Sequence, residues 1–188
     1  MAEAERRYRE LFENSPAGLF RTSLDGRVME ANRMLAGILG YDSAEDLKAH
    51  VTGMHQVYAN PEERAHLVER ALRDGAFNHY ETRVHMRDGR LKWVSASVLL
   101  IRDEDGAPLH FTGSVLDIDE RHEMQQALLR SESKYRTLVE HSQVGVFIMQ
   151  GDQYTYANHA FAAMLGREQE GLAGVSFKQI MAPDALLL

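Results

Sequence analysis

Cysteine is absent from this chain of 188 residues, and proline occurs only four times. Without cysteine the chain cannot form disulfides, thiolate metal sites, a cysteine nucleophile or a cysteine–flavin photoadduct. The absence fits a reducing compartment, so we expect the cytoplasm. No apolar run approaches the ~20 residues that span a bilayer. The charged stretch 1–10 lacks the apolar segment of a signal peptide. Neither membrane insertion nor secretion is therefore expected.

Basic charge is also in short supply, with 21 Lys and Arg against 28 Asp and Glu, a net charge of −7. An acidic chain without a basic stripe is not expected to bind nucleic acid. The chain has no phosphate-binding loop, no His-Glu-x-x-His motif and no Gly-x-Ser-x-Gly motif, so we expect no enzyme within it. His79 and His85 lie on one predicted strand about 20 Å apart, which predicts no shared metal ion. His122-Glu123 lacks the continuation typical of a kinase phospho-acceptor box and is interpreted as solvated helix.

The sequence contains an internal repeat. The segment 8–20 recurs at 135–147 with Tyr, Arg, Leu, Glu, Ser, Gly and Phe in register, and Ala31-Asn32 returns as Ala157-Asn158. Two matching blocks in the same order indicate a duplicated domain. We predict a first domain at 1–118, a linker at 119–141 and a partial second domain at 142–188. The natural chain is then expected to continue beyond Leu188, and the partial domain to be covered by another chain or to fold differently.

The first copy predicts an α+β domain with one antiparallel sheet and its helices on one face. Strands alternate in hydropathy or are rich in β-branched and aromatic residues, and Asp-Gly turns separate them. The expected strands are 18–23, 27–31, 79–87, 91–102 and 109–118, and the expected helices are 2–14, a helix capped by Asn32, a short one capped by Ser43, and 61–73.

Residues 119–141 contain no Gly or Pro and are rich in Glu, Arg, Lys and Gln, which predicts one continuous helix. Met124, Leu128, Tyr135 and Leu138 follow a 4-3 spacing, a short coiled-coil pattern. The alternative is a solvated spacer helix. In a homodimer, the expected interface consists of apolar positions on the first helix and on this linker: Tyr8, Leu11, Phe12, Leu128, Tyr135 and Leu138.

Four motifs in order resemble the PAS family. They are Ala31-Asn32, Leu39-Gly40-Tyr41, the run 88–94 (Asp-Gly-Arg-Leu-Lys-Trp-Val), and Phe111-Thr112-Gly113 leading to the run 117–121 (Asp-Ile-Asp-Glu-Arg). The last run is similar to the Asp-Ile-Thr-Glu-Arg exit motif of the family, with Asp119 where Thr is usual. The resemblance covers about 8–121 completely and 135–188 partially. It implies a five-stranded sheet, a cleft beneath the helices for a ligand or partner, and an exit helix that passes signals to an output domain, commonly a histidine kinase or an enzyme of cyclic-dinucleotide metabolism.

Strand alternation predicts which residues line such a cleft. Ala96 and Gly113 are small and lie mid-strand, which leaves room for a ligand or for a bulky helix residue. A tightly filled core is the equal alternative. The expected pocket residues are the inward positions of helices and strands: Leu35, Leu39, Tyr58, Leu67, Ala71, Tyr80, Thr82, Val94, Ala96, Val98, Phe111, Gly113 and Val115.

The chemistry of a bound group stays open. Haem, a known ligand of the family, would need His66, but Glu63 and Arg64 flank it and suggest an exposed helix face, so haem is not expected. Flavin is not expected either, and the ligand is an unknown small molecule. Two functions compete. In the first, a sensory module relays ligand binding through Asp117, Ile118 and Asp119 to the linker helix. In the second, a ligand-free module dimerises through its first helix and the outer sheet face.

Overall fold

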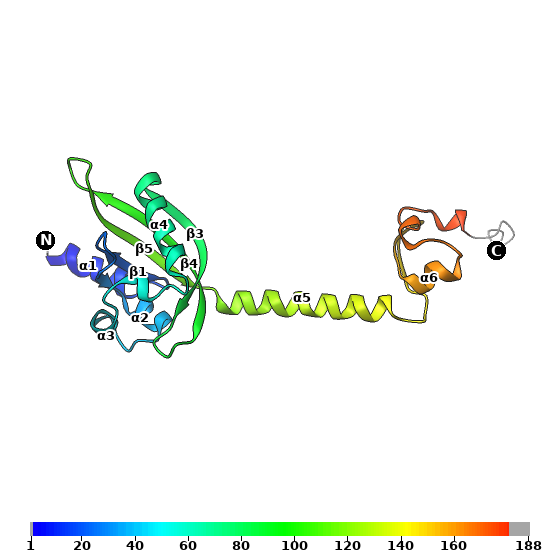
Figure 1. Ribbon diagram of the computed structural model, residues 1–188, viewed down its shortest axis with the longest axis horizontal. Coiled ribbons are helices and arrows are strands. Elements are labelled where there is room, and N and C mark those ends of the chain that lie inside the picture. Colours follow the sequence, from blue (N-terminus) through cyan, green and yellow to red (C-terminus); the bar gives the residue numbers. More distant parts are fainter. Residues whose placement is uncertain (1, 181–188) are drawn as a thin grey trace. The chain divides into compact units, whose positions relative to one another are not determined.

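The computed structural model describes residues 2–180 (Figure 1). The chain divides into two compact units, Met1–Glu123 and Met124–Leu188, which are described separately. No helix within residues 2–180 combines the length and the hydropathy that crossing a membrane requires.

The first unit is built on a five-stranded sheet with the order β2-β1-β5-β4-β3. All neighbouring strands are antiparallel. The strands are β1 (Gly18–Thr22), β2 (Val28–Ala31), β3 (Ala76–His85), β4 (Leu91–Arg102) and β5 (Pro108–Asp117). The predicted α+β class and antiparallel sheet are confirmed.

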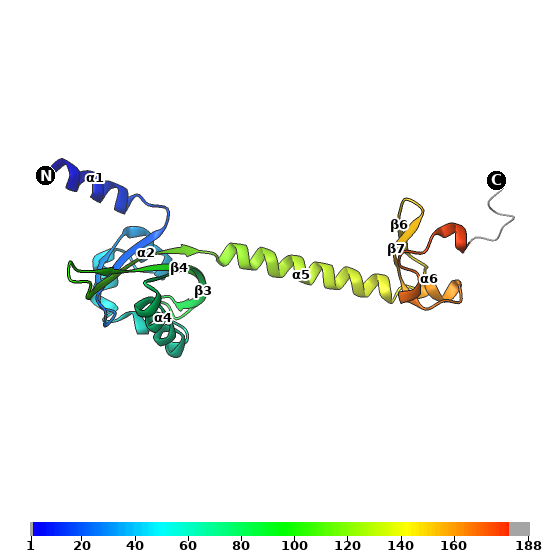
Figure 2. The ribbon, with the colours of Figure 1, turned by 90° about the horizontal axis from the view of Figure 1, so that it is seen from above.

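Helices connect β2 to β3. They are α2 (Arg33–Leu39), α3 (Ala44–His50), a 3₁₀ turn η1 (Met54–Gln56) and α4 (Pro61–Asp74), and α1 (Ala2–Glu13) precedes the sheet. α2 packs on β1, and α4 packs on β3 and β4 (Figures 1 and 2). Local signals define their ends. Asn32 and Ser43 accept hydrogen bonds from the first-turn amides, and Gly40 ends α2 with φ 80°.

The core lies between these helices and the sheet in two clusters. One gathers Leu35, Leu39, Leu47 and Val94 under α2 and α3. The other gathers Leu67 and Ala71 of α4 with sheet residues such as Phe111. Val98 is partly buried against both clusters. The segment that joins η1 to α4 connects the two clusters, because Val57 belongs to the first and Tyr58 packs against the second.

β3 begins three residues earlier than the sequence predicts and contains a bulge. The register shifts between Phe77 and Tyr80, and His79 takes φ 52°. The extra residue reverses which positions point inward, because side chains alternate along a strand. Phe77 is buried before the bulge, and Thr82 and Val84 are buried after it. Simple alternation could not place this break.

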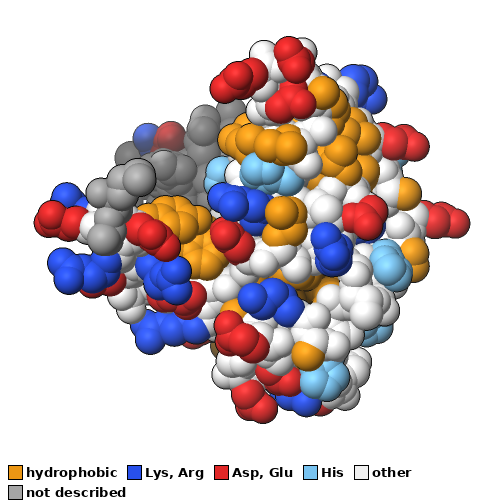
Figure 3. Space-filling view, turned by 90° about the vertical axis from the view of Figure 1, so that its left-hand side faces the viewer, with side chains coloured by type: hydrophobic (Ala, Val, Ile, Leu, Met, Phe, Trp, Pro, Cys, Tyr) orange, Lys and Arg blue, Asp and Glu red, His pale blue; other side chains and the backbone are white. Residues whose placement is uncertain are grey.

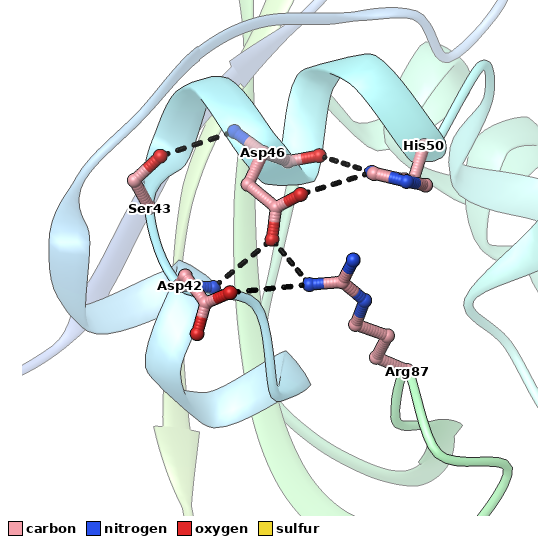
Figure 4. A network of polar contacts seen from close by, with 5 residues as sticks. All are labelled: Asp42, Ser43, Asp46, His50 and Arg87. Carbon is pink, nitrogen blue, oxygen red and sulfur yellow. Dashed lines mark hydrogen bonds and ion pairs between the residues drawn. The ribbon is translucent and has the colours of Figure 1, made fainter.

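The turn between β3 and β4 is tied to α3 by polar contacts (Figure 4). Arg87 forms ion pairs with Asp46 at 2.5 Å and Asp42 at 3.4 Å. Asp46 also contacts His50 at 3.1 Å, and its backbone N–H donates to Ser43. Because these side chains are partly exposed, the network orients the hairpin more than it stabilises the fold.

α5 (Asp119–Glu140) is a single helix, as predicted, and it has no buried residue. After it come β6 (Phe147–Gln150), β7 (Gln153–Ala157), α6 (His159–Met164), and two 3₁₀ turns, η2 (Gln169–Gly171) and η3 (Phe177–Gln179). Within the described residues the second unit therefore has two paired strands instead of five. The remaining residues of the predicted partial domain, 181–188, lie outside the described part.

The small sheet of the second unit leaves apolar side chains exposed. Val144 is 68% exposed, Ile148 58% and Phe147 46%. Phe161 is partly covered, because its ring lies 4.6 Å from Phe147 and 5.5 Å from Tyr154. The expectation that this segment lacks a sheet to pack on agrees with that exposure. Coverage by another chain stays a prediction, as do the domain boundaries at 118 and 141.

Candidate functional site

A cavity of about 40 Å³ lies between α4 and the inner face of the sheet. We call it the main cavity. Its wall is mostly apolar and is made by Phe20, Thr22, Met54, Tyr58, Arg64, Leu67, Val68, Ala71, Phe77, Val98 and Phe111. A second space of about 20 Å³, the inner cavity, lies deeper under α2; Phe20, Met54 and Tyr58 line both. An apolar hollow with a few polar groups is the usual form of a small-molecule site.

Tyr58 stands at the junction of the two cavities. Backbone bonds hold its segment against β3: the N–H of Ala59 donates to the carbonyl of Arg83, and the N–H of His85 to that of Val57. Burial raises the pKa of Tyr58 to about 12. The hydroxyl is therefore protonated at neutral pH and has a proton to donate to a bound group.

A carboxylate of α4 is anchored to β3 beside these cavities. Glu63 accepts a hydrogen bond from the Tyr80 hydroxyl at 2.8 Å and another from the Thr82 hydroxyl at 3.1 Å. The bond to Glu63 raises the pKa of Tyr80, with burial as a further cause. Both oxygens of Glu63 are thus occupied, and α4 is linked to the strand beneath it.

The structure brings most of the predicted pocket residues together. Five of them line the main cavity: Tyr58, Leu67, Ala71, Val98 and Phe111. Seven line the inner cavity, Tyr58 among them: Leu35, Leu39, Tyr58, Thr82, Val94, Ala96 and Val115.

Tyr80 and Gly113 line neither cavity. Tyr80 turns its hydroxyl to Glu63. At Gly113 the room that the sequence suggested is filled from the neighbouring strand, because an added Cβ would lie 2.7 Å from the Phe20 ring and 2.3 Å from the Ser97 carbonyl oxygen. Alternation along one strand does not show which side chain of the next strand leans over a glycine.

Arg64 is the cavity residue that sequence reasoning placed wrongly. The residues around His66 were expected to form an exposed helix face, yet Glu63 and Arg64 are only partly exposed and Arg64 lines the main cavity. His66 itself is exposed and lines neither cavity. The signal was available: Arg64 precedes Leu67 and Ala71 by three and seven residues, which puts all three on one face of a helix.

The end of the sheet meets the start of α5 through a compact junction. Lys92 pairs with Asp117 at 2.6 Å, and the Trp93 N–H donates to the Asp119 carboxylate at 3.0 Å. The Asp119 N–H donates to Asp117 at 3.0 Å, and Ile118 is buried. Partial burial opposes the ionisation of Asp117, but the hydrogen bond from Lys92 still keeps its pKa below the usual value. The three predicted relay residues thus hold the strand-to-helix turn.

His122 extends this junction. Its ring stacks on Trp93 with centroids 4.3 Å apart and an angle of 4° between the planes. Glu81 of β3 contacts the His122 Nε2 at 3.0 Å and also binds Arg121. The hydrogen bonds with His122 and then Arg121 lower the pKa of Glu81. The interpretation of His122 as solvated helix was wrong, because it did not consider which strand faces the first turn of α5.

The predicted dimer residues are accessible in both units. Tyr8 and Leu11 are 51% and 70% exposed, and Phe12, which stacks on Tyr8 at 5.8 Å, is partly buried. On α5, Leu128, Tyr135 and Leu138 are between 59% and 66% exposed.

The surface charge is mixed. Lysine and arginine side chains lie among aspartates and glutamates on the face drawn in Figure 3. Within residues 2–180, no group of three or more His, Asp or Glu side chains is arranged to hold a metal ion.

The first unit thus combines a five-stranded antiparallel sheet, helices over a partly open cavity and a helix that follows the last strand. Family comparison agrees: a profile described as "PAS fold" matches residues 12–123, and one described as "PAS domain" matches 133–186. The chain belongs to the PAS family.

The chain is similar to segments of a two-component sensor and of a probable diguanylate cyclase. The two-component sensor PprA of Pseudomonas aeruginosa is 33% identical over 60% of this chain and 12% of its own length. The probable diguanylate cyclase DgcE of Escherichia coli is 29% identical over 67% of this chain and 11% of its own. A PAS domain of Colwellia psychrerythraea shares the fold, with TM-score 0.54, 18% identity and coverage of 62% of this chain and 98% of that one. The match thus spans only about one eighth of the length of these two curated relatives.

Proposed function

We propose that residues 1–118 form a cytoplasmic sensor domain that binds a small molecule in the main cavity. In this proposal the occupied state alters how the sheet holds the start of α5, and residues 119–141 relay that change to an output domain. The names of the relatives support a histidine kinase or a diguanylate cyclase as the output. The partial second domain, 142–188, follows the relay helix.

One observation carries this proposal: of two neighbouring residues of β3, one lines the inner cavity and the other contacts the first turn of α5. Thr82 faces the helices, lines the inner cavity and bonds to Glu63 of α4. Glu81, the preceding residue, faces the other side and holds Arg121 and His122 of α5. A shift of α4 that moves β3 therefore acts directly on the first turn of α5.

A ligand acts as a signal only if it binds the two arrangements of this junction with different affinity. A ligand larger than the cavity must displace α4 from the sheet. The bonds from Tyr80 and Thr82 to Glu63 would transmit that displacement to β3. This supplies the differential interaction that the mechanism requires.

A cavity-filling substitution tests the relay without a known ligand. Ala71→Leu inserts bulk into the main cavity, whereas Ala65→Leu on the same helix is a matched control because Ala65 is exposed. We expect Ala71→Leu to change amide hydrogen exchange at residues 119–123 and Ala65→Leu to leave it unchanged. A folded Ala71→Leu variant with wild-type exchange there would contradict the relay. Native mass spectrometry with an absorbance spectrum tests separately for a bound molecule.

Dimerisation is the second candidate function. A groove of about 300 Å³ runs between α1, β2 and α3 and includes Tyr8 and Phe12, and the α5 row offers a second apolar surface. Leu128→Glu together with Leu138→Glu should convert a dimer into a monomer in sedimentation experiments. A sedimentation coefficient that stays monomeric at high concentration in the wild-type chain would exclude this candidate.

A further inference from the structure

Arg64 is the charged residue in a wall whose other polar side chains are Thr22 and Tyr58. Its guanidinium lies against the turn between β1 and β2, where a Cβ on Gly26 would come within 2.1 Å of Nη2. Gly26 also has φ 94°, so both the lack of space for a Cβ and the backbone conformation require glycine at this position. Among residues 2–180, no carboxylate forms an ion pair with Arg64 and no acceptor takes a hydrogen bond from its side chain. Arginine stays protonated, so this site keeps a positive charge.

The neighbouring carboxylate does not neutralise it. Both oxygens of Glu63 are engaged by Tyr80 and Thr82. At the Tyr58 hydroxyl, the positive charge of Arg64 has a larger effect than the negative charge of Glu63, although burial is the leading influence and raises the Tyr58 pKa. The polar corner of the cavity, formed by Tyr58 and Arg64, is therefore electropositive.

The guanidinium of Arg64, the hydroxyl of Tyr58 and the mostly apolar wall determine which kind of molecule can bind in the cavity. A guanidinium presents parallel N–H groups that match a carboxylate, and a protonated tyrosine adds one further donor. Leu67, Ala71 and Phe77 offer only hydrocarbon on the other side. An amine would meet a like charge, and a neutral hydrocarbon would leave the guanidinium without an acceptor. Arg64 is the only charged residue among those that line the main cavity, which favours a single carboxylate over a dicarboxylate.

The volume limits the size of the occupant. Since a water molecule needs roughly 10–15 Å³ of such space, the main cavity of about 40 Å³ holds about three groups of that size. Propionate has five non-hydrogen atoms, so with its carboxylate at the polar corner it exceeds this space and moves α4 outward, which is the displacement that the relay requires. Each further methylene group would require a larger displacement of α4.

We propose that the main cavity binds a short-chain monocarboxylate, with the carboxylate accepting hydrogen bonds from Arg64 and Tyr58 and the alkyl chain against Leu67, Ala71 and Phe77. This inference rests on the proposed sensory function and names the class of ligand for the same site. The opposite orientation would put the carboxylate among hydrocarbon, where an unpaired charge is costly.

The test uses the 188-residue chain and three small molecules with three carbon atoms each: propionate, 1-propanol and propylammonium. Binding is measured by calorimetry and by shifts of the backbone amides of α4 in NMR spectra. We expect propionate to bind at least about tenfold more tightly than 1-propanol, because its hydrogen bonds are charge-assisted. Propylammonium should not bind.

Variants assign the binding to this corner. Arg64→Gln should weaken propionate binding about tenfold and leave 1-propanol unchanged, and Arg64→Lys should restore part of the affinity. Arg70→Gln is the matched control on the same helix, because Arg70 lies on the surface near Asp74. Ala71→Leu should abolish binding of both propionate and 1-propanol, with the fold checked by circular dichroism.

The outcomes separate this inference from the proposed function. Equal affinity for propionate and 1-propanol, both lost in Ala71→Leu, would overturn the monocarboxylate and leave the sensor cavity standing. Propionate binding that survives both Arg64→Gln and Ala71→Leu would lie elsewhere and would overturn the inference. Absence of propionate binding would overturn it as well, and the exchange experiment with Ala71→Leu would then still decide the relay.

Discussion

The two units of this chain contain the same asparagine arrangement in very different surroundings. Asn32 Nδ2 donates to the carbonyls of Phe12 and Ala17, and its Oδ1 accepts from the N–H groups of Leu19 and Leu35, all four at 2.9 Å. The side chain thereby joins the end of α1, the start of β1 and the first turn of α2.

Asn158 repeats this pattern. Its Nδ2 donates to the carbonyls of Val139 and Val144, and its Oδ1 accepts from Val146 and Phe161, at 2.8 to 2.9 Å. Both asparagines are fully buried. The last turn of α5 is therefore bound by Asn158 in the second unit in the same way as the end of α1 is bound by Asn32 in the first.

The units differ in what surrounds this arrangement. The first adds three long strands and two clusters of buried side chains. Within residues 124–180, the second has a buried cluster of only Ala157, Ala162 and Leu172. The comparison teaches that the asparagine arrangement is specified by residues near it in the sequence. Stability depends instead on the apolar area that the long strands bury.

Replacing the asparagine in each unit should give the largest difference. Asn32→Ala removes four buried hydrogen bonds, which at about 1 kcal/mol each lowers the free energy of unfolding by about 4 kcal/mol. Trp93, the only tryptophan, belongs to the first unit, so urea unfolding followed by its fluorescence reports that unit alone. Asn158→Ala should leave this transition in place. An equal shift in both variants would show that the units unfold together.

Shortening a buried leucine should have the next largest effect, and that effect should differ between the two units. Leu47 and Leu172 are both completely buried. Leu47→Ala should cost about 3 kcal/mol in the Trp93 transition, since it opens a space in a packed core. Leu172→Ala acts in the other unit, and we expect no change in that transition but faster amide exchange in β7. A Leu47→Ala variant within about 0.5 kcal/mol of wild type would indicate a loosely packed first unit.

Capping of α3 should have a smaller effect. Ser43→Ala removes the acceptor of the Asp46 N–H and should cost about 1 kcal/mol. Ser43→Asp restores a capping oxygen and should recover most of it. If Ser43→Asp is as unstable as Ser43→Ala, then the Arg87 network, rather than the cap, orients this helix.

The two ends of α5 provide the finest comparison. Glu81 holds the first turn, and Glu140 holds the last by accepting from the Tyr156 hydroxyl at 2.7 Å and from Gln169. The bond from Tyr156 is the leading cause that lowers the pKa of Glu140. Glu81→Gln should speed amide exchange at residues 119–123 only, and Glu140→Gln at 137–140 only.

Both carboxylates have folded-state pKa values below their ordinary value, so the sign of the pH effect is the same. Their contacts contribute above about pH 4.5 and are lost as the pH falls through the lowered values. Exchange at both ends, corrected for its intrinsic pH dependence, should therefore increase toward acid pH. A Glu81→Gln variant that keeps the acid response at 119–123 would assign that response to another group.

Much of the fold was predictable because its signals are local. Asp-Gly turns separate the long strands, Asn32 and Ser43 cap their helices, and residues 119–140 lack any helix breaker. The repeat also located both asparagines and the two strands of the second sheet. Most of the predicted cavity residues follow from alternation along strands and from helical period, which depend only on spacing.

Tertiary structure alone decided the details on which function depends. The bulge at His79 sets which β3 residues face inward, the Phe20 ring occupies the space over Gly113, Arg64 turns into the main cavity, and His122 stacks on Trp93. Each is a contact between segments far apart in the chain. Sequence spacing determines the face on which a side chain lies, but only the packing of separate elements determines which group it meets.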